Sequence, residues 1–137
     1  VKFRGVFGND SGGLEEITLL NRIVRNGATT NGLPFIEWEA DPRHVDIITE
    51  QLGLKRAGRC REVSSPGIKR TFEEINGAQD LVGEQQSAYR SVCMRINYLA
   101  MDRPYILFAS KEMARWMSRP STASWEMAKR RGRYLLG

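Results

Sequence analysis

Two prolines divide the C-terminal part of this chain into segments whose apolar residues follow helical periodicity. They are Pro104 and Pro120. Because proline lacks the main-chain N–H and clashes with the preceding turn, it ends a helix or stands at the start of the next one. The pattern therefore predicts three helices, over residues 83–101, 106–117 and 122–136.

Apolar residues in these segments define the faces expected to point inward. Asp102 is expected to cap the second helix, because a carboxylate accepts hydrogen bonds from the first free N–H groups. The third helix is expected to start without a capping box, since neither Ser121 nor Thr122 has Glu or Gln three residues later. The inward residues are Ala88, Tyr89, Val92, Cys93, Ile96, Leu99 and Ala100 in the first helix, and Trp125, Ala128, Gly132 and Leu135 in the third.

The N-terminal part predicts a β-hairpin. Residues 17–25 are rich in β-branched and apolar side chains and suit one strand. Residues 35–39 alternate apolar and acidic side chains with the period of two of a second strand. Residues 26–34 between them contain two Asn-Gly steps and a proline, which are typical of a turn.

A helix is expected to begin after this hairpin. Asp41 is a suitable N-cap, and Pro42 suits the first helical position. Gly53 can end the helix in the left-handed conformation that glycine tolerates. One apolar stripe runs along it, made of Val45, Ile48 and Leu52.

Residues 54–77 show no periodicity and predict a long, basic, exposed connection. The fold class expected is therefore α+β, with an N-terminal β-hairpin, a helix, a long basic loop and a C-terminal three-helix bundle. The corresponding regions are residues 1–40, 41–82 and 83–137.

Composition excludes several classes of protein. The chain has 137 residues, which suits one domain or a fragment of one. No apolar run approaches the roughly 20 residues of a membrane-spanning helix, and no secretory signal is recognisable. We therefore expect a soluble or peripheral chain, and the sequence does not identify its cellular compartment. The first residue is Val1 rather than Met, which suggests that the numbering begins inside a longer product or after processing.

The residues that usually carry catalysis or bind metals are sparse. No disulfide is expected between Cys60 and Cys93, and with a single histidine they make no zinc-ligand set. His44 has no recognisable nucleophile beside it and is interpreted as a capping or surface residue. Glu37, Glu39 and Asp41 share one strand face, which a hard cation could use, although an exposed acidic face is the commoner arrangement. We predict no catalytic residue, metal or cofactor.

Charge is unevenly distributed along the chain. Residues 1–88 carry 11 Lys and Arg against 13 Asp and Glu, whereas residues 89–137 carry 10 against 3, a net charge of +7. A concentrated basic surface favours a phosphate backbone or an acidic partner. A solvated helical surface is the alternative interpretation.

Six residues are the candidate nucleic-acid-binding set. The side chains in the third helix form a basic stripe opposite its apolar face, which can follow phosphates without reading sequence. On the predicted strands, two arginines could add phosphate contacts and a tryptophan could stack on a base, although ordinary hairpin packing also explains the tryptophan. The set comprises Arg22, Arg25, Trp38, Lys129, Arg130 and Arg133.

An ordered series of short motifs resembles the copia-type retrotransposon polyprotein, in the reverse transcriptase region after the catalytic palm. The match spans nearly the whole chain. The resemblance implies a primer-grip hairpin, then the thumb and the connection toward ribonuclease H, with primer-template nucleic acid as partner. The motifs are Leu19-Leu-Asn-Arg-Ile-Val-Arg25, Trp38-Glu-Ala-Asp-Pro-Arg-His44, Val63-Ser-Ser-Pro-Gly67, Tyr89-Arg-Ser91, Asn97-Tyr-Leu-Ala100, Asp102-Arg-Pro104 and Arg133-Tyr-Leu135.

The chain departs from that family in ways that bear on activity. It contains no Asp-Asp step, so the metal-binding aspartates of a polymerase are missing and the chain alone should not synthesise DNA. Tyr105 stands where the family commonly has an acidic residue. Two functions follow: a non-catalytic part of a reverse transcriptase that binds primer-template through its backbone, or a retroelement-derived accessory subunit of a larger protein assembly with no nucleic-acid role.

Overall fold

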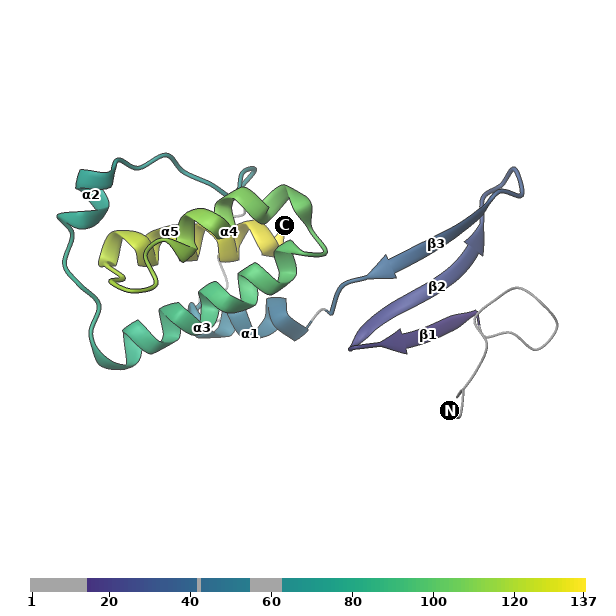
Figure 1. The fold of residues 1–137 in the computed structure, drawn as a ribbon, viewed down its shortest axis with the longest axis horizontal. Coiled ribbons are helices and arrows are strands. Elements are labelled where there is room, and N and C mark those ends of the chain that lie inside the picture. The colour runs from purple at the N-terminus through teal and green to yellow at the C-terminus, as the bar shows by residue number, and fades with distance from the viewer. Residues whose placement is uncertain (1–14, 42, 55–62) are drawn as a thin grey trace. The chain divides into compact units, whose positions relative to one another are not determined.

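The computed structural model describes residues 15–41, 43–54 and 63–137. The chain divides into two units, Val1–Asp41 and Pro42–Gly137, each of which is considered by itself. The first unit contains an antiparallel sheet and the second contains helices (Figure 1). The expected α+β class is therefore confirmed.

The sheet has three strands where a two-stranded hairpin was expected. Strands β1 (Glu16–Leu19), β2 (Arg22–Ala28) and β3 (Pro34–Glu39) pair in that order, each antiparallel to the next. The prediction of one strand over residues 17–25 is wrong, because Leu20 and Asn21 turn the chain with φ values of 50° and 63°. Two consecutive positive φ values fit the tight turn that twisted antiparallel strands favour. Leucine rarely adopts this conformation, which hid the turn from the sequence pattern.

Strand β2 also continues further than expected. Asn26 and Gly27 were predicted to lie in the loop, but they pair with Ile36 and Phe35 of β3. The Phe35 ring covers Gly27 so closely that a Cβ there would lie 2.6 Å from Phe35 Cζ. The absent side chain of this glycine therefore provides the space that the aromatic ring occupies.

Helix α1 (Arg43–Gln51) has the predicted apolar stripe. Ile48 and Leu52 are buried, and Val45 packs against the same core. The helix ends at Gly53, whose φ is +69°. There the N–H of Leu54 donates to the Thr49 carbonyl and that of Gly53 to the Glu50 carbonyl, the paired bonds of a Schellman motif. The expected first position, Pro42, lies outside the described residues.

Helix α2 (Phe72–Asn76) was not predicted. It begins in the segment expected to be an irregular connection, and a capping box holds its start: Thr71 Oγ1 accepts from the Glu74 N–H, and Glu74 accepts from the Thr71 N–H. Five residues are too few to show apolar periodicity, so only the Thr-x-x-Glu cap could have revealed it. The basic residues Lys55, Arg56, Arg59 and Arg61 of the predicted loop lie outside the described residues.

The three predicted C-terminal helices are present. They are α3 (Gly83–Ala100), α4 (Leu107–Ala114), which follows the 3₁₀ helix η2 (Pro104–Ile106), and α5 (Thr122–Leu136). The second ends three residues earlier than predicted, at Ala114. Arg103, and not Asp102, occupies the cap position before η2, without a side-chain cap.

The prediction that α5 lacks a capping box is also wrong. Ser121 Oγ accepts from the Ser124 N–H, and Ser124 Oγ accepts from the Ser121 N–H at 2.8 Å. A second serine thus performs the role usually taken by Glu or Gln. Ser121 Oγ also donates to the Ile75 carbonyl at 3.0 Å, which ties the start of α5 to α2.

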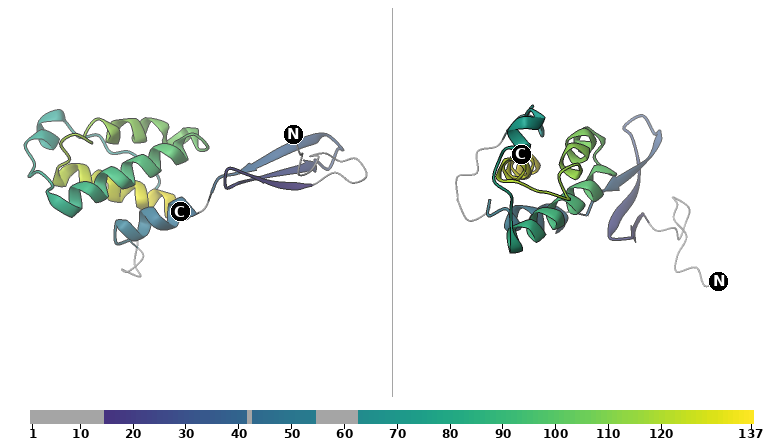
Figure 2. Two further views of the ribbon diagram at one scale, coloured as in Figure 1. Left: turned by 60° about the horizontal axis from the view of Figure 1, so that its bottom comes forward. Right: turned by 60° about the vertical axis from the view of Figure 1, so that its left-hand side comes forward.

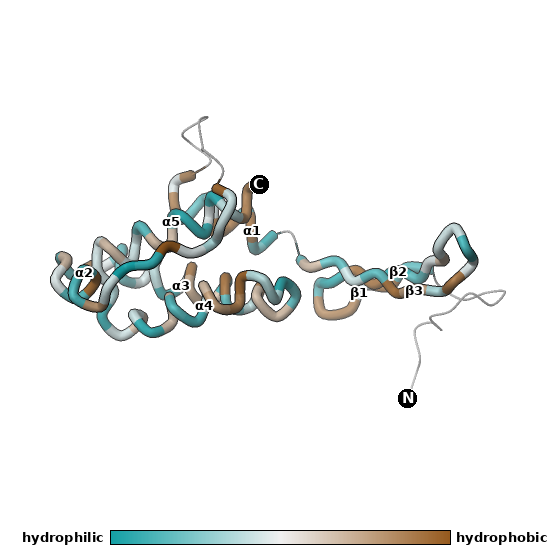
Figure 3. Tube along the Cα trace, turned by 90° about the horizontal axis from the view of Figure 1, so that it is seen from above, coloured by the Kyte–Doolittle hydropathy of each residue, from teal (hydrophilic) through white to brown (hydrophobic). Residues whose placement is uncertain are grey.

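The core of the second unit lies where α1, α3, α4 and α5 meet (Figure 2). Gly132 allows the closest approach, since a Cβ there would lie 2.5 Å from Leu54 Cδ1. Polar residues interrupt the apolar ones along every described helix (Figure 3), and none is both long and apolar enough to cross a bilayer. The fully buried side chains at the centre include Ile48, Tyr89, Val92, Ile96, Leu99 and Met113.

Candidate nucleic-acid interface

Arg25, one of the predicted phosphate contacts, is surrounded by carboxylates. It pairs directly across the sheet with Glu16 and Glu37, and Glu39 lies diagonally opposite. Its guanidinium lies 2.6 Å from Glu39, 2.8 Å from Glu16 and 4.0 Å from Glu37. Hydrogen bonds to Glu39 and then Glu16 raise the pKa of Arg25. Three carboxylates outweigh one guanidinium, so the described residues of this strand face offer no free cation to a phosphate.

The same arrangement explains the acidic residues of β3. Glu37 and Glu39 bracket an arginine instead of facing an open cation site. Asp41, the third carboxylate of the predicted set, is buried and has an interaction of its own. Across the residues that the structure describes, no three His, Cys, Asp or Glu side chains are grouped to hold a metal ion.

Arg22 and Trp38 lie together on the opposite face of the sheet. Trp38 pairs with Val24, so Arg22 is its diagonal neighbour, and the guanidinium carbon lies 5.7 Å from the centroid of the indole. This is a cation–π contact, which attracts the guanidinium to the aromatic face. Arg22 is buried, whereas 48% of Trp38 is exposed. Trp38 therefore retains an accessible aromatic surface, and Arg22 orients it.

On α5, the three predicted cations share one face but differ in what they contact. Lys129 Nζ pairs with Glu126 Oε1 at 2.9 Å, one turn earlier. Arg130 donates from Nε to the Gly67 carbonyl at 3.2 Å and from Nη2 to Ser65 Oγ at 2.9 Å. Arg133 is half-buried and has no ion-pair partner among the described residues. Only Arg133 has its full donor set available.

Arg130 fastens the segment before α2 to the helix. Its two acceptors, a carbonyl and a hydroxyl, are neutral, so the guanidinium keeps its full charge. It therefore contributes to the positive potential of α5 while part of its hydrogen-bonding capacity is used. Sequence reasoning treated Arg130 and residues 63–67 separately and missed this contact.

Arg131, the neighbour of these cations in the sequence, is buried. It is 3% exposed and donates to the carbonyls of Ala109 at 3.0 Å and Met127 at 2.8 Å. Burial lowers the pKa of Arg131, because the charged form loses hydration. Arg131 thus fixes α5 against α4, and it contributes little to the basic surface that charge counting suggested.

Two further buried groups complete this polar cluster. The Tyr89 hydroxyl donates to the Met113 carbonyl at 2.9 Å, and burial raises the pKa of Tyr89. Cys93 is a free thiol whose pKa burial raises to about 11. It is therefore protonated at neutral pH and is no nucleophile. Cys60 lies outside the described residues.

His44 belongs to the packing between α1 and α3. Its Nδ1 lies 3.4 Å from Arg95 Nη1, and its ring centroid lies 4.7 Å from that of Tyr98. These contacts give the ring a packing and hydrogen-bonding environment between the two helices.

The remaining cations of the helical unit fall into two groups. Arg115 and Arg119 pair with Glu112 at 3.1 Å and Asp80 at 3.0 Å. The second group has no carboxylate partner within the described part of the chain, and it comprises Lys69, Arg70, Arg90, Arg95, Arg103, Lys111 and Arg133. The positive charge of this unit is therefore only partly compensated.

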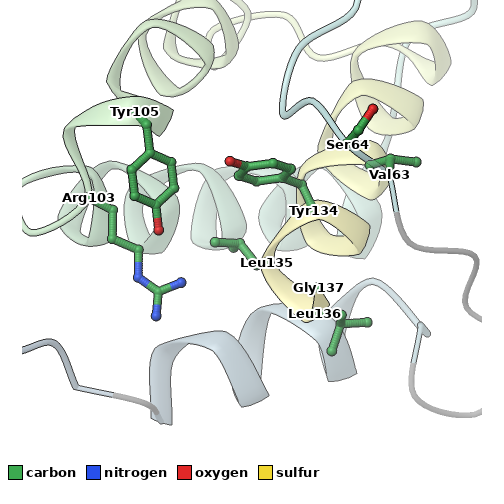
Figure 4. A pocket seen from close by; sticks show the side chains of 8 residues that line it. All are labelled: Val63, Ser64, Arg103, Tyr105, Tyr134, Leu135, Leu136 and Gly137. Atoms are coloured by element: carbon green, nitrogen blue, oxygen red, sulfur yellow. The ribbon is translucent and has the colours of Figure 1, made fainter.

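Sequence reasoning missed an open cleft at the C-terminal end of α5 (Figure 4). Its volume is about 800 Å³. Tyr105 of η2 and Tyr134 of α5 point toward one another across it, with ring centroids 6.1 Å apart and an edge-to-face angle of 68°. Arg103 lines it beside Tyr105. The two tyrosines are far apart in the sequence, so no local sequence pattern predicts that they lie together.

In comparisons with known proteins, no family model, curated protein or solved structure matches the chain. A functional assignment therefore depends on the residues and their geometry.

Proposed function

We propose that this chain is a non-catalytic part of a retroelement-derived reverse transcriptase that binds primer-template nucleic acid through its backbone. The ordered motifs that resemble the copia-type polyprotein support the lineage. The lack of an Asp-Asp step supports a binding role without polymerase chemistry.

The observation that carries the proposal is the set of cations without carboxylate partners in the helical unit. Arg103, Lys111 and Arg133 have no ion pair among the described residues, and Arg130 contacts only neutral acceptors. The phosphates of a nucleic acid backbone can neutralise such cations, and the release of the counterions condensed on the nucleic acid favours binding. Arg133 on α5 is the principal proposed contact, and Arg130 adds positive potential, whereas the charge of Lys129 is compensated by Glu126.

The sheet has a smaller part in this proposal. Arg25 is already neutralised by its carboxylates. Trp38 offers an exposed aromatic surface, steadied by Arg22, that can stack on a base or sugar.

The test is duplex binding measured by fluorescence anisotropy over a salt series. Arg133→Ala is compared with Arg115→Ala, which removes the same charge from a residue paired with Glu112. We expect Arg133→Ala to weaken binding to all sequences alike and to reduce the salt slope by about 1, while Arg115→Ala changes the slope less. Equal effects of the two variants would contradict the assignment of Arg133, and no duplex binding at low salt would contradict the proposed function.

A second candidate is a retroelement-derived accessory subunit of a larger assembly. It is favoured by exposed apolar side chains around α4, where Met101 is 72%, Leu107 52% and Phe108 74% exposed. Contiguous exposed apolar surface marks protein interfaces. Stable co-purification with other subunits, together with absent duplex binding, would support this function over the first.

A further inference from the structure

We infer that the cleft between η2 and the last turn of α5 binds one unpaired nucleotide of a nucleic acid strand. The base lies against the tyrosine pair and the phosphate on Arg103. This inference rests on the proposed function, because it specifies which form of nucleic acid this end of the helical unit takes.

The cleft has the dimensions and the free groups for such a ligand. Its volume of about 800 Å³ lies within the range of small-molecule sites. Tyr105 is 60% exposed, and neither tyrosine hydroxyl has a hydrogen-bond partner among the described residues. Aromatic rings held in place but open to solvent are the usual platforms for unstacked bases.

The charge at the cleft fits a phosphodiester. Arg103 lines the cleft and, within the described part of the chain, has no carboxylate or other ion-pair partner. A guanidinium presents its donors in a planar fork that matches two phosphate oxygens. The carbonyl end of α5 disfavours an anion close to the helix terminus, so the phosphate is expected on the Arg103 side of the cleft and the base beside Tyr134.

A duplex base pair cannot use this site, because its bases are stacked on their neighbours. An unpaired base has both faces free for an aromatic side chain. Tyr134 directly follows Arg133 in the sequence, so the cleft lies at the same end of α5 as the proposed phosphate contact. A strand bound along α5 could therefore place its single-stranded extension at the tyrosines.

The experiment measures fluorescence anisotropy of a labelled short oligothymidylate and of a duplex of the same length. Tyr105→Ala removes the aromatic platform, Tyr105→Phe keeps the ring, and Phe108→Ala removes a ring outside the cleft lining that is even more exposed, at 74% against 60%. We expect Tyr105→Ala to weaken single-strand binding about tenfold. The other two variants should stay within about twofold of the original chain, as should duplex binding by Tyr105→Ala.

Failure of this inference is distinguishable from failure of the proposed function. If Tyr105→Ala loses no more single-strand affinity than Phe108→Ala, the cleft is not the site, even where Arg133→Ala still weakens duplex binding. Equal losses for single strand and duplex would likewise overturn the inference. If the chain binds neither nucleic acid at low salt, both the inference and the proposed function fail.

Discussion

Replacing Gly132 with alanine tests the packing of α5 on the end of α1. The new Cβ would lie 2.5 Å from Leu54 Cδ1 and 2.7 Å from Leu52 Cδ1, whereas ordinary contact begins at 3.4 Å. The two leucine methyls must therefore retreat by about 0.9 and 0.7 Å. Both leucines are buried, so they have little room to do so.

Two opposing terms set the magnitude. Overpacking a core costs about 1–3 kcal/mol. Alanine in a helix interior is more favourable than glycine by about 0.8–1.0 kcal/mol. We expect the overpacking to prevail, so that Gly132→Ala lowers the free energy of unfolding by about 1 kcal/mol, within a range of about 0–2.

Urea denaturation, monitored by circular dichroism, measures this change in the free energy of unfolding. The control is the same substitution in a Leu54→Ala background, where the closer of the two contacts is removed. There Gly132→Ala should cost less stability, because the closer contact is gone and the space left by Leu54 lets the Leu52 methyl retreat. A loss of stability as large in the Leu54→Ala background as in the original chain would refute the steric explanation.

Two further predictions concern the buried cluster of α3. Tyr89→Phe removes the hydroxyl that donates to the Met113 carbonyl and should lower the free energy of unfolding by about 1 kcal/mol, measured by urea denaturation; an unchanged midpoint would mean that this hydrogen bond adds no net stability. The raised pKa of Cys93, about 11 against an ordinary 9.0, means that the unfolded chain loses this proton first as pH rises. The contribution of this thiol to the free energy of unfolding is therefore fully present below pH 9 and is lost between pH 9 and about 11. The free energy of unfolding of Cys93→Ala should decline less steeply over that pH range. Parallel pH profiles for the two proteins would contradict the assignment.

Long periodic elements could be predicted from the sequence, and short or unusually capped ones could not. The predicted limits of the last helix, 122–136, match those of α5 because its apolar positions recur over four turns and a proline precedes it. Helix α2 has five residues, too few for a period to show. The turn at Leu20 was hidden because leucine is a poor signal for positive φ.

The candidate site was harder to predict, because charge counting takes no account of partners. Arg25 and Arg133 each add one positive charge to the count. Three carboxylates surround Arg25, whereas none pairs with Arg133 among the described residues. Arg131 directly follows Lys129 and Arg130 in the sequence and is nonetheless buried. Tyr105 and Tyr134 meet only through the packing of separate elements, so their pairing is a tertiary property.

The hydroxyl of Ser121 has a consequence for the order in which this unit folds. Helix α2 is far shorter than the roughly 12 residues that an isolated helix needs to persist in water. One of its last carbonyls, that of Ile75, accepts the hydrogen bond of Ser121 from a segment 46 residues later in the chain. We therefore expect α2 to form only once α5 has docked, so that amide protons of α2 exchange at least as fast as those at the start of α5. Protection of the α2 amide protons would then measure whether α5 has docked.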